Sequence, residues 1–149
     1  MVRSGRRLAF DPGSVRIGVS VSDPDGLLAS AREAIATDDD HALRSLIAEV
    51  EPVEVIVGLP IGLDGRAGKA VQRARDFAQR LAELTDVPLR MVDERLSTVQ
   101  AQRGLHDRGH SVRQSRTMID SASAAVVLQH ALDAERATSQ PPGEVFEAT

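Results

Sequence analysis

Two acidic residues stand at the ends of apolar, strand-like segments. Asp11 closes the first such segment at the turn Pro12-Gly13, and Glu94 directly follows the apolar run 89–92. Strand ends line the functional crevice of α/β sheets, so both carboxylates are candidates for chemistry. Each also has a structural explanation, because Asp11 can cap its turn and Glu94 can pair with Arg95 or sit as a charge at a helix start.

A third acidic residue, Asp120, lies on the apolar side of an expected helix. At helical spacing it shares a stripe with Ala124, Val127 and Ala131, the face that must pack on a sheet. An ionised carboxylate there is costly unless a positive or hydrogen-bonding group meets it. Arginine, backbone amides or a metal ion would meet that need. The alternative is a helix cap, although Thr117 already offers one.

Convergence of these three acids in one crevice would require a cation to offset their repulsion. Mg²⁺ or Mn²⁺ prefers oxygen ligands and accepts a few carboxylates together with water and substrate phosphate. One or two such ions suit phosphodiester hydrolysis, because one activates water and a second stabilises the leaving oxygen. If they converge, Asp11, Glu94 and Asp120 would be both the catalytic residues and the metal ligands.

The composition fits one compact domain. The chain has 149 residues, an apolar share of 42% and a net charge of -4. It has no apolar run long enough for a membrane helix and no secretory start, so we expect a cytoplasmic protein with no membrane partner. The absence of cysteine excludes disulfides and thiolate chemistry.

Hydrophobic periodicity predicts a three-stranded antiparallel meander followed by helix, strand, helix, strand and helix. This order implies an α/β fold with a mixed five-stranded sheet, in which two parallel strands join the meander and helices flank the sheet. We expect one domain over residues 1–136 and a disordered tail over 137–149. The expected strands are about 6–11, 17–22, 27–36, 53–58 and 88–93, and the expected helices about 38–50, 68–84 and 117–135, with a less regular helix from Ser97 or Thr98 and a mobile basic stretch at 106–116.

Positive charge is concentrated in two segments of the chain, 66–80 and 90–116. Residues 66–80 hold five bases against one acid, and all but one of the chain's eighteen bases are arginine, which suits bidentate phosphate contact. Solvated helix faces explain many surface arginines equally well. The candidate substrate-binding residues are Arg16, Lys69, Arg73, Arg95, Arg113 and Arg116, with Arg80, Arg103 and Arg108 in the same basic stretches.

Four ordered motifs resemble those of the YqgF/RuvX family, with coverage from about Leu8 to Leu132. The motifs are Leu8-Ala9-Phe10-Asp11-Pro12-Gly13 with Arg16 to Asp23, Val57-Gly58-Leu59-Pro60, Val92 to Thr98, and Ile119-Asp120-Ser121. The resemblance implies an RNase H-like nuclease that either processes the 5′ end of pre-16S rRNA or resolves Holliday junctions. It also implies that Asp11, Glu94 and Asp120 form the acidic triad.

Two positions depart from the family pattern. Related junction resolvases carry a second acid one turn after the helix aspartate, where this chain has Ser123. This leaves open whether one or two ions bind, unless Asp93 or substrate phosphate completes the second site. Gly62 replaces a common loop Asn.

Other functions compete with the nuclease. A nucleic-acid-binding RNase H-like module without catalysis would keep the fold, but an intact acidic triad argues against it. Asp11-Pro12-Gly13-Ser14 also resembles the phosphate loop of actin/hexokinase-type ATPases, which need two domains to enclose ATP. A symmetric junction as substrate would favour a homodimer over a monomer.

Overall fold

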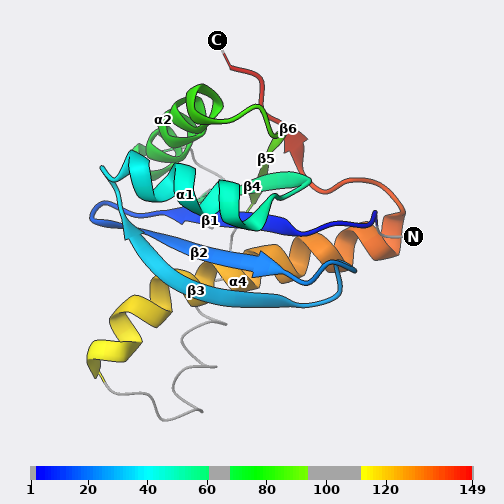
Figure 1. Cartoon of the computed structure of the whole chain (residues 1–149), viewed down its shortest axis with the longest axis horizontal. Coiled ribbons are helices and arrows are strands. Elements are labelled where there is room, and N and C mark those ends of the chain that lie inside the picture. The colour runs from blue at the N-terminus through cyan, green and yellow to red at the C-terminus, as the bar shows by residue number, and fades with distance from the viewer. Residues whose placement is uncertain (1–2, 61–67, 94–111, 149) are drawn as a thin grey trace.

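The computed structural model describes residues 3–60, 68–93 and 112–148, with the backbone alone for 112–120. At its centre is a six-stranded mixed sheet in the order β3-β2-β1-β4-β5-β6 (Figure 1). The strands are β1 (Arg7–Pro12), β2 (Arg16–Ser22), β3 (Ala29–Ala36), β4 (Glu54–Leu59), β5 (Leu89–Asp93) and β6 (Glu144–Val145), and the helices are α1 (Asp40–Val50), α2 (Lys69–Leu84) and α4 (Val112–Thr138).

Local turn chemistry builds the antiparallel meander β1-β2-β3. Between β2 and β3, the Asp23 carboxylate accepts hydrogen bonds from the backbone N–H groups of Leu27 and Leu28, at 2.7 and 2.9 Å. The backbone hydrogen bond from Leu28 is the main cause that lowers the pKa of Asp23. Gly26 completes the turn with φ +67°, a conformation that favours glycine.

Two hydrophobic clusters lie on opposite faces of the sheet. On one face, Leu8 and Phe10 of β1 pack with buried residues of α1 and α2. On the other face, Ala9 of β1 and Ile56 of β4 pack against α4. Figure 1 shows α1 and α2 on one side of the sheet and α4 on the other. Strand alternation therefore assigns every residue of β1 to a definite helix layer.

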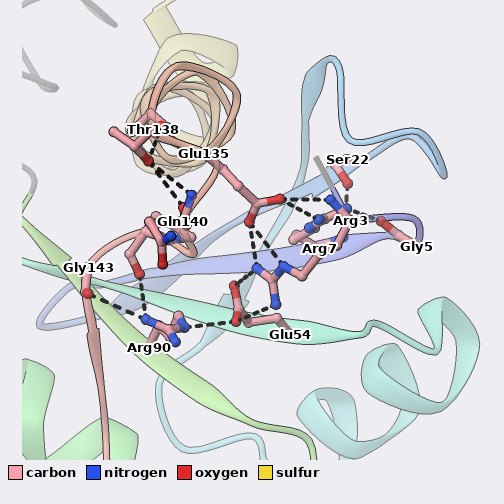
Figure 2. A network of polar contacts seen from close by, with 12 residues as sticks. Arg3, Gly5, Arg7, Ser22, Glu54, Arg90, Glu135, Thr138, Gln140 and Gly143 are labelled. Carbon is pink, nitrogen blue, oxygen red and sulfur yellow. Dashed lines mark hydrogen bonds and ion pairs between the residues drawn. The ribbon is translucent and has the colours of Figure 1, made fainter. Parts of the chain in front are cut away.

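A partly buried ion-pair network joins the start of the chain to the end of α4 (Figure 2). Arg7, with a side chain only 1% exposed, donates from Nη2 to Glu135 Oε2 at 3.0 Å. Arg3 binds Glu135 Oε1 at 2.6 Å and Glu54 Oε1 at 3.0 Å. Arg90 binds Glu54 Oε2 at 2.9 Å. We call these five residues the clamp, and they tie β1, β4, β5 and α4 together.

The clamp shifts the ionisation of its members. Burial raises the pKa of Glu135, but hydrogen bonds from Arg3 outweigh this effect and the pKa is lowered overall. The hydrogen bonds to Glu54 and Glu135 raise the pKa of Arg3. Arg3 and Glu135 therefore stay ionised around neutral pH.

The sheet and the final helix differ from the sequence expectation in three respects. The sheet has a sixth strand, β6, which pairs antiparallel with β5 through Arg90↔Val145 and Met91↔Glu144. The expected disordered tail 137–149 thus contains a strand, and Arg90 Nη1 donates to Pro142 O at 3.1 Å. Helix α4 begins at Val112, so the end of the stretch expected to be mobile is helical.

The other expected elements within the described residues are confirmed to within a few residues at their ends. The helix expected from Ser97 or Thr98 lies outside the described residues. In the described part of the chain, no helix combines the length and apolar character needed to span a bilayer.

Candidate active site

Parallel pairing brings the carboxyl ends of β1, β4 and β5 to one edge of the sheet. Phe10 of β1 pairs with Val57 of β4, which pairs in turn with Met91 of β5. Asp11 therefore lies at the same edge as Asp93, the last residue of β5. We call this the carboxyl edge, and it is where open α/β sheets bind ligands.

Asp11 is half-buried at this edge, and strand alternation places it on the α4 face with Ala9. Its antiparallel partner in β2 is Gly18. On the other side, Gly58 of β4 directly follows Val57, the partner of Phe10. Both positions that flank Asp11 in the neighbouring strands are thus glycine, so neither strand places a side chain beside its carboxylate.

Helix α4 approaches β2 closely through small residues. Ser121 Oγ accepts a hydrogen bond from Val19 N at 3.3 Å, and Ser20 Oγ donates to Ala124 O at 2.9 Å. Val19 pairs with Phe10, the residue before Asp11. These contacts bring the backbone of Asp120, the residue before Ser121, close to the end of β1. The side chain of Asp120 lies outside the described side chains.

Glu94 and Asp93 were the other acidic residues considered as ligands beside β5, and only Asp93 lies within the described residues. Glu94 lies outside the described residues, immediately after Asp93 in the sequence. Asp93 pairs with Leu59, and alternation puts it on the α2 face with Met91. It therefore faces away from Asp11, which argues against its completing a second ion site with that carboxylate.

The predicted substrate-binding residues fall on both faces of the sheet. Arg16 begins β2, half-buried, and alternates with Ile17, so it shares the α4 face with Asp11. Lys69 and Arg73 are exposed on α2, which covers the opposite face. Arg113 and Arg116 lie in α4 where the backbone alone is described, and Arg95 lies outside the described residues.

The donor set suits a hard divalent cation. Asp11 offers carboxylate oxygens beside two glycine positions, and Glu94 and Asp120 would add only oxygen donors. Among the side chains that the structure describes, no three acidic or histidine residues form a metal-binding group. Two of the three proposed ligands lie outside that set, so the metal site stays a prediction.

Gly18 and Gly58 lie within two of the motifs, but the sequence alone did not identify them as the neighbours of Asp11. Gly18, Ser20 and Ser22 alternate with the apolar residues of β2, and this pattern of small residues indicates a face closely approached by another element. Gly58 carries no comparable pattern of its own. Its position beside Asp11 follows only from the pairing of β4 with β1.

The sequence matches a family of known proteins along most of its length. Residues 5–134 match the profile of a family described as "RuvX: Holliday junction resolvase". A Leifsonia xyli protein named "Putative pre-16S rRNA nuclease" is 49% identical and covers 98% of this chain and 97% of its own length. A Thermobifida fusca protein of the same name is 49% identical, with 99% of both chains covered.

A solved structure shares the fold at low sequence identity. Thermus thermophilus RuvC in complex with a Holliday junction substrate has a TM-score of 0.58 and 17% identity, covering 95% of this chain and 99% of that chain. The mixed sheet flanked by helices is thus the RNase H-like fold that the motifs implied. With a family profile that spans most of the chain and near-full-length relatives named as nucleases, the chain belongs to the RuvX family and is a nuclease.

Proposed function

We propose that this nuclease is a divalent-metal-dependent endonuclease that processes the 5′ end of pre-16S rRNA. Asp11, Glu94 and Asp120 would hold Mg²⁺ or Mn²⁺. The observation that carries the proposal is the position of Asp11 at the carboxyl edge, with the glycines Gly18 and Gly58 on its two flanks. The near-full-length relatives named for pre-16S rRNA favour RNA as the substrate.

In this proposal the described residues bind and orient the metal ion and the substrate. Asp11 pairs with Gly18 of β2, and the preceding residue Phe10 pairs with Val57 of β4, so the backbone of Asp11 has a defined position at the strand end. Arg16 shares its face and would contact a substrate phosphate. A bound Mg²⁺ or Mn²⁺ ion would supply activation of water and stabilisation of the leaving oxygen. The small residues that draw α4 onto β2 would keep Asp120 at the same crevice.

Holliday junction resolution is the second candidate. The shared fold with a RuvC that binds a Holliday junction supports it. The identity to that chain is only 17%, whereas the relatives named for pre-16S rRNA reach 49%. The lower identity makes DNA junctions the less favoured substrate.

Cleavage mapping with purified protein and Mg²⁺ tests the proposal. A precursor rRNA 5′ leader and a four-way DNA junction would be compared under identical conditions. We expect cleavage at a defined site in the RNA, with loss of more than about a hundredfold in Asp11→Asn, because even outer partners of metal ligands cost about ten- to a hundredfold.

Asp86→Asn provides the matched control, since Asp86 is exposed outside the carboxyl edge and the substitution is chemically the same. Its cleavage rate should equal that of the wild type. Undiminished cleavage by Asp11→Asn would contradict the proposal. Binding of RNA without any metal-dependent cleavage would favour the non-catalytic module.

A further inference from the structure

A pocket of about 450 Å³ opens beside the β1–β2 turn, on the α2 side of the sheet. Its apolar wall comes from Pro12, Ile17 and Phe77, and its positive charge from Lys69, Arg73 and Arg80. This volume lies within the range of about 300–1,000 Å³ that is usual for small-molecule sites. The combination of an apolar wall and cationic side chains matches a nucleotide, which has an apolar base and an anionic phosphate.

The apolar wall is rigid. Ile17 is 1% exposed and Phe77 5% exposed, so both are anchored in the core. Phe77 also packs edge-to-face on Phe10, with ring centroids 5.5 Å apart. The Arg80 guanidinium lies 5.8 Å from the Phe77 ring centroid and donates from Nε to Asp40 Oδ1 at 2.5 Å. Arg80 is therefore fixed as part of the wall.

Two cations remain available for a ligand. Lys69 and Arg73 are exposed and lie one helical turn apart on α2. Among the side chains that the structure describes, neither forms an ion pair. Asp76 brings a negative charge to the same lining, and its carboxylate accepts a hydrogen bond from Gln72 Nε2 at 2.8 Å. The lining carries more positive than negative charge, which favours an anion.

The pocket and Asp11 share one hairpin. Pro12 and Gly13, which line the pocket, directly follow Asp11 in the chain. Gly13 N donates to Arg16 O at 3.0 Å, and a Cβ on Gly13 would lie 2.6 Å from that oxygen, so the turn has no room for a side chain there. A nucleic-acid strand that crosses this narrow turn would reach Asp11 on one face and the pocket on the other.

We propose that this pocket binds one unpaired nucleotide of the nucleic-acid substrate, next to the bond that is cut. The base packs on the wall formed by Pro12, Ile17 and Phe77, and Lys69 and Arg73 bind its phosphate. The inference rests on the proposed nuclease function, since it places the cut at Asp11. It makes single-stranded character beside the cleavage point a determinant of specificity.

Fluorescence anisotropy tests this inference through binding alone. The probes are a blunt RNA duplex and the same duplex with a single-stranded 5′ extension, bound to Asp11→Asn protein so that cleavage does not interfere. We expect tighter binding of the extended duplex. The double variant Lys69→Ala/Arg73→Ala should lose about tenfold in affinity for the extended duplex, the loss expected for a charge-assisted phosphate contact, with little change for the blunt one.

Two further substitutions on α2 give matched comparisons. Arg75→Ala removes an exposed charge that does not line the pocket and should leave the preference for the extension intact. Asp76→Asn removes the negative charge from the lining and should strengthen binding of the extended duplex. The double variant and these two single variants alter only exposed side chains. Thermal melts would verify that each variant is folded.

Three results would overturn the inference. The first is equal affinity for blunt and extended duplexes in the protein whose pocket is unsubstituted. The second is an equal loss of affinity for both duplexes in the double variant. The third is binding of free AMP that depends on Lys69 and Arg73 without any preference for the extension, which would identify a mononucleotide site. Each readout is independent of cleavage, so failure of the proposed nuclease activity would be seen separately.

Discussion

At the scale of single residues, the clamp shows how buried charge constrains this chain. Glu135 is nearly inaccessible and binds both Arg3 and Arg7. A buried ion pair adds little net stability relative to a well-packed apolar alternative, but loss of one partner leaves an uncompensated charge. Arg7 is the charge at risk, because its side chain is only 1% exposed.

We therefore expect Glu135→Ala to lower the free energy of unfolding by about 3–5 kcal/mol, since Arg7 would stay buried without its carboxylate. Chemical denaturation measures this change. Asp133→Asn is the matched control on the same helix, because Asp133 pairs with Arg136 at the exposed surface. Its cost should stay below about 1 kcal/mol. Similar losses in the two variants would contradict the role of the clamp.

The lowered pKa of Glu135 gives this effect a pH dependence. A carboxylate with a lowered folded pKa contributes its full stability above its ordinary value, 4.5 for this residue, and loses it as the pH falls through the folded value. The stability gap between wild type and Glu135→Gln should thus be constant above that pH and shrink below it. A gap that stays unchanged in acid would show that folding does not lower the pKa of Glu135.

At the scale of elements, the contact of α4 with β2 positions the candidate site. Ala124 is fully buried, and its carbonyl oxygen accepts from Ser20 Oγ at 2.9 Å. A larger side chain there would push the helix away from the sheet. Asp120, one turn earlier on α4, would then move relative to Asp11.

Ala124→Leu should therefore lower stability by about 1–3 kcal/mol, the usual cost of overpacking, and should also reduce cleavage in the folded variant. Leu132→Met is a suitable control, because Leu132 is buried on the same face nearer the clamp and the swap nearly conserves volume. Thermal melts and cleavage rates would be measured together. Normal cleavage by a destabilised but folded Ala124→Leu would show that the helix position does not control the site.

Elements with strong periodicity could be predicted from the sequence, whereas those that depend on tertiary contacts could not. The apolar stripe Ala124, Val127 and Ala131 is buried as expected. Strand β6 has only two residues after a Pro-Pro-Gly turn, and it exists because the edge of β5 offers hydrogen-bond partners. The pairing of Arg7 with Glu135, 128 residues apart, likewise leaves no local signal.

The candidate site was predictable to a similar degree. Asp11 was identified as a strand-end carboxylate, and the structure places it at the carboxyl edge. The exposure of Lys69 and Arg73 on α2 follows from helical periodicity. Their separation from Asp11 by the thickness of the sheet does not, because periodicity along one helix does not reveal which face of the sheet that helix covers.

At the scale of the whole molecule, a bound cation should couple the sheet edge to overall stability. If Asp11, Glu94 and Asp120 share an ion, Mg²⁺ or Mn²⁺ at a hundredfold excess over its Kd should raise the Tm by roughly 5 to 10 °C. The reason is that the ion binds only where the three segments are folded together. Differential scanning calorimetry measures the shift.

The same measurement on variants separates an ion site from a salt bridge. Asp11→Asn should remove the metal-dependent shift. Asp120→Asn should raise the Tm without metal, by relieving repulsion between carboxylates. A lower metal-free Tm for Asp120→Asn would instead indicate a structural ion pair at that residue.

The position of the clamp also determines where the protein tolerates a fusion or a truncation. Arg3, close to the amino terminus, binds Glu54 at the start of β4 and Glu135 near the end of α4. Asp11 lies near the opposite ends of the parallel strands. A fusion partner or surface linker attached at the amino terminus would therefore leave the carboxyl edge accessible to a nucleic-acid substrate, whereas trimming the first residues would remove Arg3 and weaken the domain.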